Sequence, residues 1–277
     1  MSGRRLDLTR MVLALSQGGH DRERMDAIGE LAELLHLEIQ GLLFEDPGLR
    51  ALAGHTFARE LRTIGPAWSP VEATRLAEEM EGAAEALRRR FFGIFGRRRL
   101  KTHFEVARQS AAAAFGTLRP GDVLVLVEPV DPVELACSHL APLPESAETA
   151  GAVLIVPAPL VRRRGPVVAI AAESGDSSIE LALTIAAAAG ERLIVLSPPA
   201  RDAERAASAA ERSLMPVAVE EIPFEVARAR PADIASRLAG VNERLIVASR
   251  TRLDRTIGAA AASLLRVPVL LTGNTSD

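Results

Sequence analysis

The sequence predicts an α/β protein made of two similar units in tandem, each a five-stranded parallel sheet with helices on both faces. Short apolar runs rich in β-branched residues recur along the chain, which is typical of strands buried on both faces of a parallel sheet. Stretches of helical length and pattern separate these runs, and such alternation favours parallel sheets. The pentapeptide FEVAR occurs twice, at Phe104–Arg108 and Phe224–Arg228, with the same order of predicted elements after each copy. We therefore predict a duplicated unit.

The second half shows the alternation most compactly. Its predicted strands are residues 165–173, 192–199, 224–229, 243–249 and 267–273. Its predicted helices are residues 177–189, 200–213, 230–239 and 253–266. Ser177 and Glu180 have the spacing of a capping box, and Gly190 suits the position after a helix end. Pro231 and Gly240 mark the two ends of the third helix in the same way.

The first half follows the same order but is longer. Its predicted strands are residues 10–16, 37–45, 103–109, 121–129 and 151–159. Its predicted helices are residues 21–36, 110–118 and 132–141. The extra length, at about 47–100, is predicted to be a helical insertion. The charged stretch at 161–166 is the predicted boundary, which divides the chain into domain 1, residues 1–162, and domain 2, residues 163–277.

The composition excludes several classes of protein. Hydrophobic residues make up 48% of the 277 residues and the net charge is −3, so nothing draws the whole chain to nucleic acid or anionic membranes. Cys137 is the single cysteine and none of the five histidines has the spacing of a metal site, so we expect neither a disulfide nor a metal. No apolar run approaches the roughly 18 residues that span a bilayer. We expect a cytoplasmic protein that is not an integral membrane protein.

Two stretches of the second half resemble the universal stress protein family. Residues 166–197 (PVVAIAAESGDSSIELALTIAAAAGERLIVLS) resemble its first strand, turn, helix and second strand. Residues 257–273 (IGAAAASLLRVPVLLTG) resemble its closing helix and strand. The resemblance implies two Rossmann-like, adenine nucleotide alpha hydrolase-like units in a tandem repeat. It also implies a role in stress response, with a homodimer or another protein as partner.

Nucleotide-binding members of that family carry a glycine-rich segment after the fourth strand, of the form Gly-x-x-Gly, about nine residues, then Gly-Ser/Thr. Glycines let backbone N–H groups approach phosphates at a helix N-terminus. In the second half Gly258 matches the late glycine, but Ala259 replaces the hydroxyl residue and no early glycine is present. The first half has no glycine there and carries Glu128 and Asp131, which would repel a triphosphate. We therefore expect no cofactor, with ATP as an alternative in the second half alone.

Ligands of doubly wound sheets bind beyond the carboxyl ends of the strands, where the strand order reverses. Any small-molecule site of the second half is therefore predicted there. The candidate binding residues are Glu173, Ser174, Gly175, Ser249, Arg250, Arg252 and Gly258.

Other motifs give no catalytic site. The two glycines in SQGGHD, at Ser16–Asp21, suit either a phosphate cradle or a tight turn in which His20 or Asp21 caps the next helix. No Lys-Ser/Thr follows them, so the turn is favoured. The chain has no Gly-x-Ser-x-Gly elbow and no conspicuous carboxylate pair. We do not expect an enzyme.

Six arginines flank three phenylalanines in RRRFFGIFGRRR, at Arg88–Arg99. They are Arg88, Arg89, Arg90, Arg97, Arg98 and Arg99. One interpretation is a contact with an anionic surface such as a membrane, a nucleic acid or an acidic protein. The other is structural: a long helix, acidic early and basic late, complements its own dipole while the phenylalanines dock on the core or on a partner. The structural interpretation is favoured.

Three functions are thus open. The leading one is a non-catalytic, stress-associated regulatory or interaction protein that does not bind ATP in the family's usual way. The second is adenine-nucleotide binding or weak ATPase activity through the second domain. The third is an adaptor to an anionic surface through Arg88–Arg99.

Overall fold

The structure is a computed structural model, and it describes most of the chain. The described residues are 7–15, 21–45, 47–61, 67–109, 111–128, 149–160, 162–172, 176–199, 217–226 and 229–273. The helices predicted at 132–141 and 200–213 lie outside them.

The described elements follow the predicted alternation. The strands are β1 (Arg10–Leu15), β2 (Glu38–Phe44), β3 (Arg59–Leu61), β4 (Trp68–Pro70), β5 (Thr102–Ala107), β6 (Asp122–Val127), β7 (Ala152–Val156), β8 (Val167–Ile170), β9 (Leu193–Ser197), β10 (Val219–Pro223), β11 (Leu245–Ser249) and β12 (Val269–Thr272). The helices are α1 (Arg22–Leu34), α2 (Pro47–Ala53), α3 (Ala73–Phe95), α4 (Ala111–Phe115), α6 (Ser177–Ala189), α8 (Pro231–Arg237) and α9 (Arg255–Leu265).

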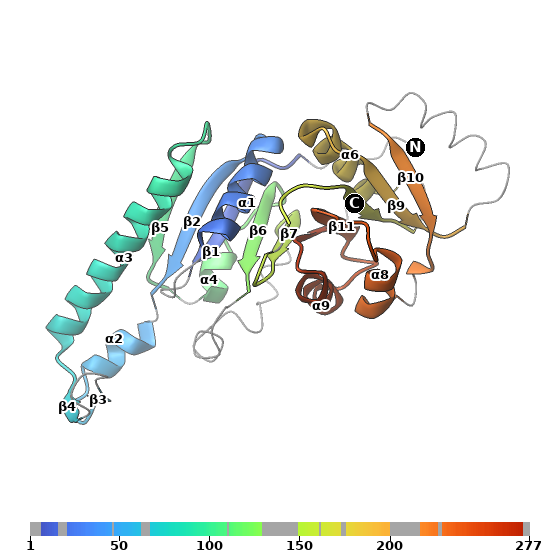
Figure 1. The fold of residues 1–277 in the computed structure, drawn as a ribbon. Helices are drawn as coiled ribbons and strands as arrows, with labels where there is room; N and C mark the ends of the chain where they lie inside the picture. The colour runs from blue at the N-terminus through green and yellow to red at the C-terminus, as the bar shows by residue number, and fades with distance from the viewer. Residues whose placement is uncertain are drawn as a thin grey trace.

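Ten strands form one continuous sheet in the order β10-β9-β8-β11-β12-β7-β6-β1-β2-β5 (Figure 1). Within each half the five strands are parallel and have the same order, with the first strand between the second and the fourth. The halves meet where β7 pairs antiparallel with β12. The predicted α/β class is confirmed, but the two sheets that we expected are joined edge to edge.

The junction between the halves is symmetric. Leu154 pairs with Leu270, while Val153 pairs with Leu271 and Ile155 with Val269. A two-fold axis through the first pair therefore exchanges β7 and β12, and with them the order of strands on either side. This symmetry is consistent with the predicted tandem arrangement.

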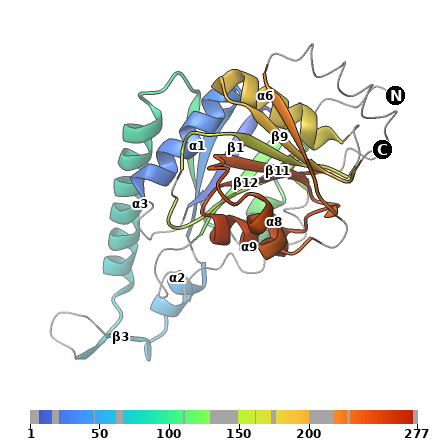
Figure 2. The same cartoon turned by 45° about the vertical axis from the view of Figure 1, so that its right-hand side comes forward.

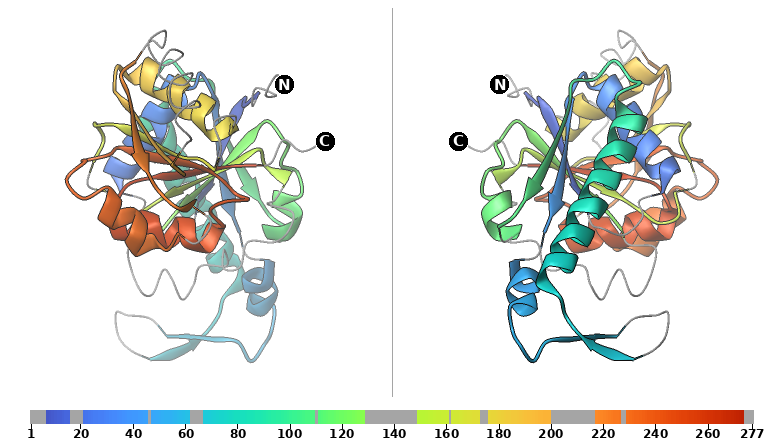
Figure 3. Two further views of the ribbon diagram at one scale, coloured as in Figure 1. Left: turned by 90° about the vertical axis from the view of Figure 1, so that its right-hand side faces the viewer. Right: turned by 90° about the vertical axis from the view of Figure 1, so that its left-hand side faces the viewer.

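Helices cover both faces of the sheet (Figure 3). The side chains of α1, α3 and α6 join one apolar cluster, while those of α4, α8 and α9 join the other. Alternate residues of each strand enter the two clusters: Leu13 packs on the first face and Val12 on the second. Burial on both faces explains why the strands are nearly continuous apolar runs.

Helix ends were predicted in part. Asp21 caps α1 by accepting a hydrogen bond from the Glu23 N–H, as one of the two predicted alternatives required. Gly190 follows α6 in the left-handed conformation with φ 66°, which confirms the predicted helix end. The capping box at Ser177 and Glu180 is wrong, because the cap of α6 is Asp176, which accepts from the Ser178 N–H.

The two FEVAR copies do not occupy equivalent positions. Phe104 lies inside β5, whereas Phe224 follows β10, so the strand predicted at 224–229 is wrong. The strand registers pair Ile39 with Thr102 and Leu193 with Val219. Phe104 lies two residues after Thr102, the partner of Ile39 in the first half. Phe224 lies five residues after Val219, the partner of Leu193 in the second half. The tandem order of the strands does not depend on the pentapeptide.

The insertion contains more than helix. Between α2 and α3, the short strands β3 and β4 pair antiparallel, and α2, β3 and β4 form an arm that extends away from the body (Figure 2). Helix α3 then returns along the sheet and packs on β2, β5 and α1.

Two of the three phenylalanines of the arginine-rich stretch dock on the core, as the structural interpretation predicted, but the first turn of α3 has no acidic residue and its last turn no basic one. Phe91 and Phe95 are fully buried. The ring of Phe91 occupies the space above Gly41, where a Cβ atom would lie 2.7 Å from the ring. Arg98 lies against Gly29 of α1 and donates to Glu33 at 2.7 Å and to the Asp26 carboxylate at 3.0 Å. One of the six arginines is therefore part of the helix packing.

Candidate functional site

The strand order places two crevices at the carboxyl ends of the strands. The order reverses between β1 and β6 in the first half and between β8 and β11 in the second. These are the positions at which doubly wound sheets bind ligands. Of the predicted site residues, Glu173, Ser174 and Gly175 lie outside the described residues.

The second crevice contains a tight turn after β11. Ser249 ends the strand and is 6% exposed, and its Oγ lies 2.8 Å from Thr251 Oγ1. The Arg252 N–H donates to the Ser249 carbonyl at 3.0 Å. Arg250 reaches across β12 instead, where its guanidinium donates to the Ala150 carbonyl at 2.8 Å. The structure thus brings Ser249 and Arg252 together and turns the Arg250 side chain toward the first half.

Gly258 has a packing role. A Cβ atom at this position would lie 2.9 Å from Leu271 Cδ1, so the glycine lets α9 lie close on β12. It stands in the first turns of the helix and faces the sheet rather than an open loop. This contact explains why the residue is glycine without any role in binding phosphate.

The N-terminus of α9 already holds a negative charge. The Asp254 carboxylate accepts a hydrogen bond from the Ile257 N–H at 2.8 Å. Helix N-termini bind anions through their free N–H groups and their dipole. A phosphate at this end would compete with the Asp254 carboxylate for the same N–H groups and would be repelled by it.

A buried arginine lies at the first of these positions. Arg24, in the first turn of α1, is only 2% exposed and donates from Nη1 to the Glu128 carbonyl at 2.5 Å. Glu128 directly follows β6, and its carboxylate accepts from Ser263 Oγ of α9 at 2.5 Å and from the Ala158 N–H at 3.3 Å. Arg24 and Glu128 are therefore both engaged by other groups of the protein at the position where the strand order of the first half reverses.

Sequence reasoning missed Arg24. The signal was available, because Arg24, Ile28 and Leu31 follow helical spacing, which places the arginine on the buried stripe of α1. A charged side chain on such a stripe requires a polar partner inside the protein.

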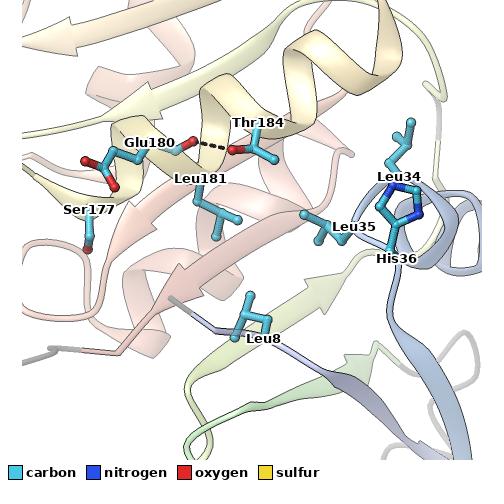
Figure 4. Close-up of a pocket in the computed structure, with 8 residues that line it drawn as sticks. All are labelled: Leu8, Leu34, Leu35, His36, Ser177, Glu180, Leu181 and Thr184. Carbon is cyan, nitrogen blue, oxygen red and sulfur yellow. Dashed lines mark hydrogen bonds between the residues drawn. The ribbon is translucent and has the colours of Figure 1, made fainter. Parts of the chain in front are cut away.

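A small pocket lies between α1 and α6 (Figure 4). Its volume is about 220 Å³, below the range of pockets that hold drug-sized ligands. Its lining residues are Leu8, Leu34, Leu35, His36, Ser177, Glu180, Leu181 and Thr184. Leucines form much of the wall, and none of the eight lining residues is lysine or arginine. The pocket therefore offers nothing that would neutralise a triphosphate.

Ion pairs join the halves near the predicted boundary. Arg163 and Arg244 both bind the carboxylate of Glu30 on α1, at 3.3 and 2.9 Å. Arg162 lies 3.7 Å from Glu243, which is 1% exposed. Arg162 and Arg163 at the boundary are thus paired across the halves.

Glu243 gives a testable pH dependence. Neither of its carboxylate oxygens has a hydrogen-bond partner among the described residues, and burial raises the pKa of this carboxyl above its ordinary value of 4.5, although Arg162 acts in the opposite direction. Because the folded-state pKa is the higher one, the group contributes stability below the unfolded pKa and loses it as the pH rises through the folded pKa. We expect Glu243→Gln to reduce the fall in unfolding free energy between about pH 4 and pH 8. Urea unfolding at both pH values measures this, and an unchanged difference would contradict it.

Metal and membrane features are absent from the part of the chain that the structure describes. No group of three or more His, Cys, Asp or Glu side chains there could hold a metal ion. None of the described helices is both long and apolar enough to cross a membrane.

The chain has the universal stress protein fold. A universal stress protein from Archaeoglobus fulgidus DSM 4304 matches with a TM-score of 0.60 and 13% identity, over 95% of this chain and 96% of that chain. A candidate universal stress protein from Pseudomonas aeruginosa UCBPP-PA14 matches with a TM-score of 0.49 and 14% identity, over 97% and 94%. No protein-family model matches the sequence, and no curated protein resembles it in sequence. The likeness confirms the fold that the sequence predicted, and function has to be argued from the crevices.

Proposed function

We propose that the protein is a non-catalytic, cytoplasmic regulatory or interaction protein of the universal stress type, which acts without bound ATP. The observation that supports this is that an acidic side chain of the chain itself lies at the carboxyl ends of the strands in each half, Glu128 in the first and Asp254 in the second. Asp254 caps α9 in the second half, and Arg24 binds the Glu128 carbonyl in the first.

The energetic argument concerns what a nucleotide would have to displace. An anion at α9 would need the Asp254 carboxylate to leave its N–H group, and a cap of this kind contributes about 1 kcal/mol. In the first half a phosphate would have to replace the Glu128 carbonyl as the partner of Arg24, and it would be repelled by the nearby Glu128 carboxylate. Neither crevice is therefore ready to receive phosphates.

Native mass spectrometry of the protein, purified without added nucleotide, tests the proposal. We expect the mass of the polypeptide and its oligomers with no adenine nucleotide attached. A stoichiometric increment that matches AMP, ADP or ATP would overturn the proposal.

Nucleotide binding through the second half is a second candidate. It is favoured by Ser249 and Arg252, which meet in the turn after β11. Gly258 is a poor residue for testing it, because any larger side chain would press on Leu271 and disturb the helix packing. Arg252→Glu is the better variant: this candidate requires saturable ATP binding that the substitution weakens by ~10-fold or more.

Recruitment to an anionic surface is a third candidate. It is favoured by the exposed side chains of Arg88 and Arg89, which lie 3.9 and 3.7 Å from Glu85 on the same helix face. Arg98 has little to contribute, since it binds Asp26 and Glu33 of α1. Such pairs at a solvated surface are weak, so the arginines could exchange Glu85 for another anion.

A further inference from the structure

The arm carries most of the exposed large apolar side chains of the described chain. Five of the seven lie between the start of α2 and the end of β4. They are Leu49, Leu52, Phe57, Leu61 and Trp68. Phe57 and Trp68 are 76% and 64% exposed, so the two aromatic side chains alone present on the order of 250 Å². Single exposed apolar side chains are ordinary, but a group of this size marks an interaction surface.

The pair of strands β3 and β4 has one apolar face and one polar face. Its register pairs Leu61 with Trp68, and Glu60 with Ser69. Successive side chains of a strand point to opposite faces, so the first pair lies on one face and the second pair on the other. On the polar face, Glu60 binds Arg75 of α3. The polar face is therefore turned toward α3, and the face of Leu61 and Trp68 is turned away from it.

The charged side chains of β3 are sorted between the same two faces. Glu60 is ion-paired with Arg75 on the polar face. Arg59 lies two residues before Leu61 and shares the apolar face, where it is exposed and has no ion pair among the described residues. Tryptophan and arginine suit the membrane–water interface, because the indole ring is amphipathic and the guanidinium binds phosphate. The apolar face therefore has the chemistry that binds phospholipid headgroups and the upper part of their acyl chains.

The two strands lie at the far end of the arm, beyond α2 and away from the ten-stranded sheet (Figures 1 and 2). A projecting end meets a flat surface before the body of the molecule does. The backbone of this end is held in place, because the Val71 N–H donates to the Ala58 carbonyl at 3.1 Å beside the strand pair, and α2 packs on α3. A shallow contact between the arm and a membrane therefore requires no opening of the core.

We propose that the arm docks the protein on a phospholipid membrane surface. Leu61 and Trp68 enter the interface together with Phe57, and Arg59 binds a headgroup phosphate. Apolar contact holds the arm there rather than net charge, because exposed glutamates around the start of α3 oppose attraction to anionic lipid. These glutamates are Glu72, Glu78 and Glu79. The docking does not depend on whether the crevices bind nucleotide, and it differs from recruitment through Arg88–Arg99, which requires anionic lipid and weakens with salt.

The fluorescence of Trp68 reports directly on the docking, because it is the single tryptophan of a chain without tyrosine. The full chain is mixed with vesicles of phosphatidylcholine alone, or of phosphatidylcholine with phosphatidylglycerol. We expect the emission to shift to shorter wavelength with both, and lipid brominated in its acyl chains to quench it. The shift should persist from about 0.1 M to about 1 M salt, over which the Debye length falls from ~10 to ~3 Å. An emission spectrum that neither vesicle changes would overturn the proposal.

Two leucines of nearly equal exposure give a matched pair of variants. Leu61 in the arm is 55% exposed and Leu264 on α9 is 54% exposed, so an aspartate at either position leaves the core intact. We expect Leu61→Asp to weaken vesicle binding by ~10-fold or more and Leu264→Asp to leave it unchanged, while the circular dichroism of both stays that of the wild type. Equal vesicle binding by the two variants would overturn the proposal. Binding to anionic vesicles alone, lost with Arg88→Glu and Arg89→Glu, would overturn it in favour of the surface adaptor.

Discussion

Replacing Phe91 with alanine is expected to lower the free energy of unfolding by about 4 kcal/mol. The ring is 1% exposed and fills the space over Gly41, where β2 has no side chain. It also contacts the rings of Phe95, at 4.8 Å between centroids, and Phe104, at 5.5 Å. Its removal leaves a cavity that a glycine-bearing strand cannot fill, so α3 loses its main anchor on the sheet. Urea unfolding followed by circular dichroism measures the loss.

The adjacent ring is the control for this substitution. Phe92 is 37% exposed, whereas Phe91 is 1% exposed, so Phe92→Ala should cost less than about 1 kcal/mol. Equal losses for the two variants would show that α3 does not dock through Phe91. They would contradict the packing described for the insertion.

Replacing Gly165 with alanine is the second large effect. The residue precedes β8 at the junction of the two halves and has φ 124°, which side chains rarely adopt. A Cβ atom there would lie 2.1 Å from the backbone carbonyl oxygen of Asn242, which cannot move aside as a side chain can. Strain and clash together should cost about 3 kcal/mol or more in unfolding free energy.

Gly190 gives the matched control, because it shares the strain but not the clash. Its φ is 66° and a Cβ atom would meet nothing within 4 Å. Gly190→Ala should therefore cost about 1–2 kcal/mol, the price of the left-handed conformation alone. Thermal unfolding of both variants compares them, and a Gly165→Ala protein as stable as Gly190→Ala would show that the close approach to Asn242 is absent.

Buried strands could be predicted from the sequence, and so could the edge strand β5, but the other edge strand, β10, could not. β8, β9, β11 and β12 are almost fully buried, so their sequences are apolar throughout. β10 lies at the end of the sheet and reads VEEIP, because one side of an edge strand faces solvent. The apolar residues that follow it, Phe224 and Val226, are buried although they lie outside the strand. The strand was therefore predicted at these residues instead.

The edge-to-edge junction of the halves could not be predicted either. A buried strand is apolar whether its neighbours belong to its own half or to the other half. The sequences of β7 (AVLIV) and β12 (VLLT) therefore do not reveal that these strands pair antiparallel. A site was predicted only in the second half, and the contacts of the first half were not predicted. Asp254 as a cap and Arg24 as a buried donor depend on which side chains meet across elements, and spacing along the chain does not give that.

Titration calorimetry with magnesium and ATP tests the central claim, that the protein's own side chains close both crevices. We predict no saturable heat for the wild-type protein at any ATP concentration up to the millimolar range of weak binding, where the binding free energy is about −4 kcal/mol. Saturable binding of one or two ATP per chain would contradict the claim, because the phosphates would have to lie beside the carboxylates of Asp254 or Glu128.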